Sequence, residues 1–302
     1  MSNINNIEAA KIIENNINLS FTFKYTDSQI HPIHFIQAIK ALIGLNLDNP
    51  NRKLLDFSKS YFDKQAIDKY FSKSQTIQKV NPVVSLQDLE NALKSNNRQS
   101  AIDIFNHIKL VSSEIHILEY LIEISLKQSG KSFLIIWSIY KSVLFLKDKN
   151  IDKFKELAID ILLNDKFRDI NQNNSTTNIN VFLKLDLSID SLNLYAHLNE
   201  AYKTDLIRSE NIQKLIESLL VHKFKDLKNN DYLEKKYEPK YPKLITKGRP
   251  YILDLINQME CKLNVDIILF LDSIRTLFRF NDKKNHKLII YHLENKMESL
   301  YV

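Results

Sequence analysis

The sequence predicts an all-α protein, built as an irregular multi-helix bundle or an array of antiparallel helices. Only three of its 302 residues are glycine, whereas glycine makes up about 7% of an average protein. Tight hairpin turns and phosphate-binding loops depend on the access of glycine to positive φ, so neither is expected here. Apolar residues instead recur every three or four positions between polar stretches, which is the period of an amphipathic helix. About eleven to thirteen helices are therefore expected.

Helix signals in the first half of the chain come from prolines, capping residues and apolar spacing. Pro32 is expected to begin a helix capped by His31, because proline is tolerated at the first helical position. Asn49, followed by proline, opens the next segment in the same way. Ser85 and Asp88 form a capping-box pattern, with Asp in place of the usual Glu. Further helices are predicted at the apolar positions Ile104, Phe105 and Ile108, then Ile115, Leu118, Leu121 and Ile122 before Gly130, then Ile151, Phe154, Leu157, Ala158 and Ile161.

The longest apolar run is FLIIWSIYKSVLFL at residues 133–146. It is apolar nearly all round, which predicts a central helix surrounded by others. Ser138, Lys141 and Ser142 interrupt it, and it is shorter than the ~20 residues that a membrane span needs. No membrane span is therefore expected. Later helices are predicted at residues 189–202, 210–223, 251–261, 265–280 and 287–301.

Two polar stretches interrupt the helical pattern and suggest a division into domains. Residues 164–181 are rich in asparagine and are predicted to link an N-terminal helical lobe at 1–163 to a C-terminal helical lobe at 182–302. Residues 225–250 contain three of the six prolines and are predicted to form an exposed charged loop. No fixed period of the tetratricopeptide or ankyrin kind is present, which favours an irregular bundle over a solenoid.

Composition limits the compartment and the partners. Cys261 is the only cysteine, so an intrachain disulfide and a four-cysteine zinc site are excluded, which favours a reducing, cytoplasmic location. The first twenty residues lack the basic and apolar regions of a secretory signal. The formal net charge of +6 is spread along the chain, and nucleic-acid binding needs a focused basic stripe. Nucleic acid is therefore not an expected partner.

Two histidines, His31 and His34, flank the start of the helix that Pro32 begins. The positive end of the helix dipole disfavours protonation there and leaves neutral imidazoles able to act as a base or a metal ligand. The competing interpretation is that His31 caps the helix and His34 is a core residue. An open zinc site needs three protein ligands and no third is evident, so no metal is predicted. Trp137 and Tyr140 are the predicted pocket wall.

Histidines that are distant in the sequence provide a criterion for a site. A site is indicated if any two of His31, His34, His107, His116 and His197 converge on a cavity. One of them, His116, shares a helical ridge with Glu119 and Glu123, and such a ridge could ligate iron or manganese with help from another helix. A solvated acidic face is favoured instead, because charged residues are mostly exposed.

A basic cluster surrounds the end of the helix predicted at 265–280. Its members are Arg275, Arg279, Lys283, Lys284 and Lys287. It could bind phosphate or an acidic partner, and the neighbouring Phe278 and Phe280 could stack on a base. The same phenylalanines continue the apolar spacing of the helix, which favours a core bordered by a solvated basic rim.

The stretch HPIHFIQAIKALIGLNLDNPNRKLLDFSKSYFDKQ, residues 31–65, is similar to the opening of questin oxidase-like proteins. The matching positions are Ala38, Ile39, Leu42, Gly44 and Tyr61, together with His31 or His34. The later stretch KSFLIIWSIYKSVLFLKDKNIDKFKELAIDIL, residues 131–162, resembles the Phe-His helix of that family and the helix after it. Leu134 stands where the second histidine of that family would be expected.

The resemblance implies an all-helical oxidoreductase that acts on an aromatic or polyketide-like small molecule. The missing histidine implies altered or lost activity, with His31 or His34 as the remaining base or ligand. The residues alone leave a second class open, which is a noncatalytic helical interaction module whose basic rim meets an acidic protein. The sequence identifies neither the substrate nor the cofactor.

Overall fold

The computed structural model describes residues 5–25, 30–64, 84–146, 151–169, 178–229, 237–259 and 263–300. Fourteen α-helices lie in these ranges, and thirteen of them have seven or more residues. The described residues contain no strand, and the isolated bridges that join two of them pair Gln128 with Phe167 and Leu185 with Asn229. The predicted all-α class is therefore confirmed.

The helices follow one another along the chain with short connections between most of them. They are α1 (Asn6–Ser20), α2 (Pro32–Ile43), α3 (Arg52–Lys64), α4 (Leu86–Lys94), α5 (Arg98–Val111), α6 (Glu114–Leu126), α7 (Lys131–Phe145), α8 (Lys155–Asn164), α9 (Ile189–Lys203), α10 (Ser209–Phe224), α11 (Lys243–Lys247), α12 (Tyr251–Gln258), α13 (Val265–Phe280) and α14 (His286–Leu300). Short 3₁₀ turns lie at Ile151–Lys153, Ile179–Lys184 and Lys283–Asn285.

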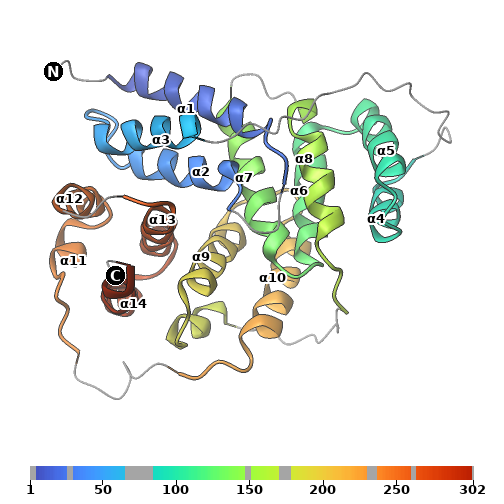
Figure 1. Ribbon diagram of the computed structural model, residues 1–302. Coiled ribbons are helices and arrows are strands. Elements are labelled where there is room, and N and C mark those ends of the chain that lie inside the picture. Colours follow the sequence, from blue (N-terminus) through green and yellow to red (C-terminus); the bar gives the residue numbers. More distant parts are fainter. Residues whose placement is uncertain are drawn as a thin grey trace.

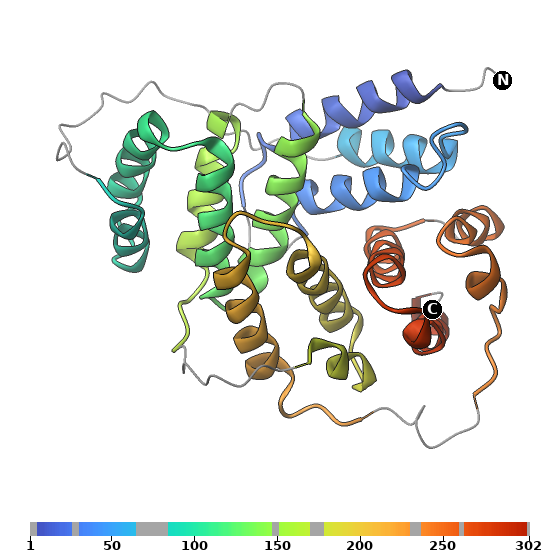
Figure 2. The same cartoon turned by 180° about the vertical axis from the view of Figure 1, so that it is seen from behind.

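Four helices, α2, α7, α9 and α13, form the centre of the molecule. Helix α13 packs on α9 and α2, and α7 packs on α2 and α9. Helices α1 and α3 cover α2, while α6 and α8 flank α7, and α10 lies against α6 and α9. The α4 and α5 pair packs on α8 at the edge farthest from α11 to α14, as both ribbon views show (Figures 1 and 2). The central position of α7 agrees with its apolar sequence.

Helices from both predicted lobes meet in this centre, since α2 and α7 precede residue 164 and α9 and α13 follow residue 181. Residues 170–177 of the predicted linker, residues 230–236 of the predicted charged loop and Cys261 lie outside the described residues. The described end of the charged loop contains α11, whose Leu244 is buried. The division into two lobes stays a prediction.

The helix starts follow local capping chemistry. His31 Nδ1 accepts a hydrogen bond from the backbone N–H of Ile33, so His31 is the N-cap of α2. Ser85 and Asp88 form the predicted capping box at α4. The cap of α3 is Asn51, two residues after the predicted Asn49, because the side chain of Asn51 accepts from the N–H of Leu54. Side-chain hydrogen-bond acceptors in the sequence therefore predicted the N-caps of α2, α3 and α4 to within two residues.

Gly130 adopts a left-handed conformation at the start of α7, with φ of 96°. A Cβ added there would lie 3.4 Å from Leu194 Cδ2 and 3.5 Å from Leu219 Cδ2. We expect Gly130→Ala to lower the free energy of unfolding by about 1–2 kcal/mol, because L-residues are strained at positive φ. Gly44, with φ of −62°, is the matched control, and Gly44→Ala should change stability by less than about 0.5 kcal/mol. Urea denaturation checks this, and equal effects would contradict it.

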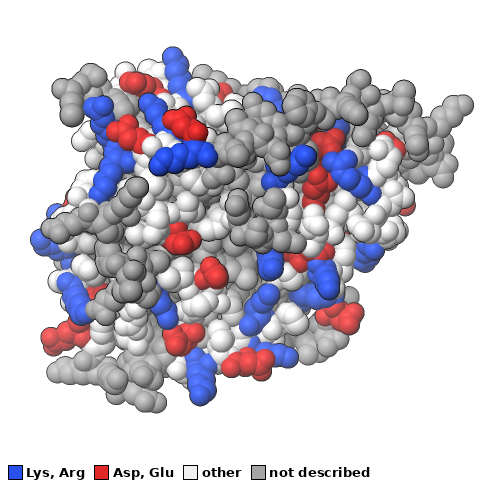
Figure 3. Space-filling model, in the orientation of Figure 1, with Lys and Arg blue, Asp and Glu red and all other residues white. Residues whose placement is uncertain are grey.

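The surface carries charges of both signs. On the face in Figure 3, Lys and Arg are interspersed with Asp and Glu, so the described part of this face has no single-sign stripe. Within the described ranges, no helix has the length and apolarity that crossing a bilayer requires.

Candidate functional site

A buried polar cluster lies where α2, α7, α9 and α13 meet, and we call it the polar junction. Its residues are His34, Gln37, Trp137, Ser138, Lys141, Ser142, Asn193, His197, Glu200, Asp272, Ser273, Arg275 and Thr276. All of them are buried except Lys141, whose side chain is 17% exposed. Residues three and four apart share a helix face, so each of the four helices presents its polar members to the same centre.

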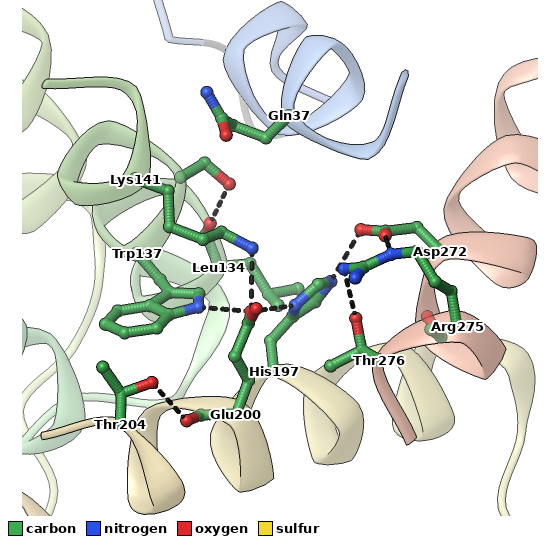
Figure 4. A network of polar contacts seen from close by, with 12 residues as sticks. Gln37, Leu134, Trp137, Lys141, His197, Glu200, Thr204, Asp272, Arg275 and Thr276 are labelled. Carbon is green, nitrogen blue, oxygen red and sulfur yellow. Dashed lines mark hydrogen bonds and ion pairs between the residues drawn. The ribbon is translucent and has the colours of Figure 1, made fainter. Parts of the chain in front are cut away.

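Glu200 is the point at which three donors converge. The indole N–H of Trp137 and the amine of Lys141 each donate to Glu200 Oε2 at 2.8 Å, and His197 Nδ1 lies 3.2 Å from the same oxygen (Figure 4). Burial opposes ionisation of Glu200, but the charge of Lys141 and the hydrogen bond from His197 outweigh it. The pKa of Glu200 is therefore held well below its ordinary value.

Asp272 and Arg275 form the second buried ion pair, one helical turn apart on α13. Arg275 Nε donates to Asp272 Oδ1 at 2.6 Å, and the side chains are 5% and 1% exposed. His197 Nε2 lies 3.7 Å from Asp272 Oδ2, so the imidazole stands between the carboxylates of Asp272 and Glu200. Loss of one partner of a buried ion pair strongly destabilises a fold, because the other charge is left uncompensated. This arrangement is therefore sensitive to substitution.

The hydrogen bonds of His197 leave one ring nitrogen without a partner in the described part of the chain. Nδ1 faces the ionised carboxylate of Glu200, so it carries the proton and donates. Nε2 has no hydrogen-bond partner among the described residues, and Asp272 Oδ2 lies 3.7 Å from it. Unpartnered buried polar atoms are rare in folded proteins. His197 Nε2 is therefore a buried ring nitrogen of the junction that lacks a hydrogen-bond partner among the described residues.

The ring of His34 lies against His197 in an edge-on arrangement, with 5.4 Å between the ring centroids. Ser138 Oγ donates to Leu134 O, so His34 Nδ1–H donates to Ser138 Oγ at 3.0 Å, and Nε2 accepts from Asn193 Nδ2 at 3.0 Å. Burial lowers the pKa of His34 well below its ordinary value, and His197 and Lys141 lower it further. His34 is therefore neutral, and both of its nitrogens are bonded.

His31 lies outside the junction. Its Nε2–H donates to Phe23 O at 3.2 Å, while Nδ1 caps α2. Burial lowers the pKa of His31 to about 4, and the bond to Phe23 opposes this only in part. Of the predicted wall residues, Trp137 belongs to the junction, and Tyr140 stacks on its ring at 5.1 Å. The structure thus brings together His34 and His197, and not His31 and His34.

Glu119 and Glu123 of α6 are buried, so the prediction that they form a solvated face is wrong. Glu119 is 1% exposed and accepts the backbone N–H groups of Ile207 and Arg208, just before α10 begins. Glu123 is 3% exposed and pairs with the guanidinium of Arg208, with Oε2 2.9 Å from Nη2. The loop before α10 covers this face. In the described ranges, no group of three His, Cys, Asp or Glu side chains is arranged to hold a metal.

The basic cluster is also divided differently from the prediction. Arg275 is 4% exposed and bonded to Asp272, so it belongs to the core and not to the solvated rim. The exposed members are Arg279, Lys283, Lys284 and Lys287, around the connection from α13 to α14. Phe278 is buried, as the apolar spacing predicted. Helical spacing places Arg275 one turn from Asp272, on the face that meets α9.

An open cleft of about 700 Å³ lies away from the junction, between the connection from α2 to α3 and helix α12. Asparagines and charged side chains dominate its wall, among them Arg52, Lys53, Lys247 and Asp254. No residue of the polar junction lines it. The cleft and the junction are therefore separate candidates for binding.

The fold and the junction define an all-helical protein with a buried centre of histidines, carboxylates and cations. No protein-family model matches the chain, and no characterised protein or solved structure shows a significant similarity to it. The resemblance to questin oxidase-like proteins therefore stays a prediction.

Proposed function

We propose that the chain is a helical oxidoreductase-like protein of a reducing cytoplasmic compartment, and that it binds an aromatic or polyketide-like small molecule at the polar junction. The observation that carries the proposal is the pair of rings of His34 and His197 beside two buried ion pairs. Such clusters often stabilise a fold less than apolar packing would. Strongly perturbed ionisable groups concentrate at functional sites.

His197 is the proposed base. Glu200 orients its ring through Nδ1, which leaves Nε2 to accept a proton, and a histidine held in this way is suited to general base catalysis. Asp272, at 3.7 Å, would stabilise the imidazolium that forms. Removal of a proton from a phenolic hydroxyl is the chemistry that these residues would supply. Trp137 and Tyr140 would form the aromatic wall.

Access to the junction is proposed to pass the side chain of Lys141. His197 is 2% exposed, whereas the side chain of Lys141 is the partly exposed member and is bonded to Glu200 at 2.8 Å. Movement of this flexible side chain would open a path between α2 and α7 without rearranging either helix. An anionic or phenolic ligand would meet the Lys141 ammonium first.

Fluorescence of the single tryptophan tests the proposal, because Trp137 is itself a junction residue. We expect 1-naphthol and larger polycyclic phenols to change this fluorescence in a saturable way, and His197→Gln to weaken that binding about tenfold or more. His107→Gln is the matched control, since His107 is bonded to the backbone carbonyl of Asp103 on α5. Absence of saturable binding, or equal binding by the His197→Gln protein, would reject the proposal.

A noncatalytic interaction module is the second candidate, and one observation favours it. Both ring nitrogens of His31 and of His34 are bonded to protein groups, as in structural histidines. In this case the exposed rim of Arg279, Lys283 and Lys284 would meet an acidic protein. Two results together would favour this candidate: the wild-type protein binds no phenol, and His34→Ala lowers the stability.

A further inference from the structure

Lys40 lies beside the polar junction on α2, and no described residue neutralises its amine by direct pairing. Its Nζ donates to the backbone carbonyl of Lys141 at 3.3 Å and lies 4.9 Å from the centroid of the Phe145 ring. Within the described ranges, no carboxylate forms an ion pair with it, since the nearby Glu200 is bonded to Lys141. Lys40 as a whole is neither fully buried nor fully exposed.

The charges that face Lys40 come from three other helices. Lys141 on α7 and Arg275 on α13 are cationic, whereas Glu200 on α9 and Asp272 on α13 are anionic. Burial of the amine is the largest effect, and the neighbouring Lys141 adds to it, so that the pKa of Lys40 falls to about 7. Near neutral pH a large fraction of this amine is therefore unprotonated, and an unprotonated amine is a nucleophile.

We propose that Lys40 is a nucleophilic lysine that forms a reversible imine with an apolar or aromatic aldehyde or ketone. Its amine reaches from α2 to the carbonyl of Lys141 and the ring of Phe145 on α7. The contacting Phe145 is 39% exposed, and Leu144, which precedes it in the chain, is 44% exposed. These two side chains would hold the apolar part of the carbonyl compound while its carbon faces the amine. The inference uses no histidine, so it is independent of the function proposed above.

The reaction balances without an oxidant. The lone pair of Nζ attacks the carbonyl carbon, a C–N bond forms, and the oxygen takes up a proton to give a carbinolamine. The C–O bond then breaks, and the oxygen leaves as water with the two hydrogens that the amine has lost. A C=N double bond remains, and addition of water reverses the process. A desolvated lysine beside a second cation is a known means of making such an amine reactive near neutral pH.

Reductive trapping of the full chain with benzaldehyde and sodium cyanoborohydride tests the inference, because the reductant converts an imine into a stable secondary amine. Peptide mass spectrometry then gives the modification rate of each lysine. At pH 7 we expect Lys40 to react about tenfold faster or more than Lys53 and Lys214, since an ordinary lysine is almost fully protonated there. Lys53 is the matched control, being partly buried and bonded to the carbonyls of Ile256 and Met259. A rate at Lys40 no higher than at Lys214 would overturn the inference.

The pH profile and two variants sharpen the test. The rate at Lys40 should be half-maximal near pH 7, and a midpoint above pH 9 would count against the proposal. Lys141→Met should move this midpoint upward, and if that variant does not fold, the wild-type profile decides. Labelling of Lys40 in the His197→Gln protein should match the wild type, which keeps a failure of the proposed function distinct from a failure of the lysine chemistry.

Discussion

Replacement of Glu200 by alanine is expected to destabilise the protein by about 3–5 kcal/mol, because removal of one partner leaves a buried charge uncompensated. Lys141 would lose its ion pair, and the indole N–H of Trp137 and Nδ1–H of His197 would lose their acceptor. The carboxylate is only 6% exposed, so water does not replace these bonds without rearrangement of the centre. Urea denaturation at pH 7 measures the effect.

Glu210 offers the matched control for this substitution. It also lies on a helix and pairs with a lysine, Lys214, but the two side chains are 84% and 70% exposed. Exposed pairs of this kind contribute little to stability, so Glu210→Ala should leave the urea midpoint unchanged. Similar losses in both variants would show that the Glu200 network does not stabilise the centre.

Acidification from pH 7 to pH 5 is expected to lower stability steeply, through histidines that are buried in the neutral form. Burial lowers the pKa of His31 to about 4 and lowers the pKa values of His34 and His292. These groups bind a proton in the unfolded chain below about pH 6.5, but not in the folded chain. Their stabilising effect is therefore complete above pH 6.5. It is lost as the pH falls toward the pKa of each histidine in the folded chain. Each such histidine contributes up to about 1.4 kcal/mol per pH unit to the slope of the unfolding free energy. The three together contribute up to about 4 kcal/mol per pH unit.

Urea denaturation at pH 7.5, 6.5, 5.5 and 4.5 checks this dependence. His31→Asn keeps a side-chain acceptor at the N-cap position and removes one titrating ring. The slope of unfolding free energy against pH should then fall by up to about 1.4 kcal/mol per pH unit between pH 6 and pH 5. A wild-type slope close to zero in this range, or a slope that His31→Asn does not reduce, would contradict the assignment of neutral buried rings.

Local signals made the fold class and the helix starts predictable. Proline after His31, the capping box of Ser85 and Asp88, and the apolar run at 133–146 act within one or two turns of chain. Such signals act through backbone geometry and nearby hydrogen bonds, which depend little on distant residues. The predicted cap of α3 was two residues early, because asparagines at 46, 49 and 51 offer similar acceptors.

The composition of the site was less predictable, because its partners are far apart in the chain. Lys141 and Glu200 are separated by 59 residues, and Glu123 and Arg208 by 85. The pattern of a polar residue on an apolar helix is the same whether that residue meets water or a partner from another helix. Glu119, Glu123 and Arg275 were therefore predicted to be solvated, although all three are buried. A signal was present in part, since Asp272 and Arg275, and likewise His197 and Glu200, stand three residues apart, which is the spacing of neighbours on one helix face.

The sequence by itself determined an all-helical protein with a central helix at residues 133–146 and His31 as an N-cap, because each feature depends on short-range periodicity or capping. Only the tertiary structure decided that His34 lies against His197, and that Lys40 lies beside Lys141 with no carboxylate of the described residues paired to it. These relations depend on which helix faces meet in the core. Whether a buried charge is paired, and hence whether an imidazole or an amine is neutral, is set by groups that the chain brings together from more than a hundred residues away.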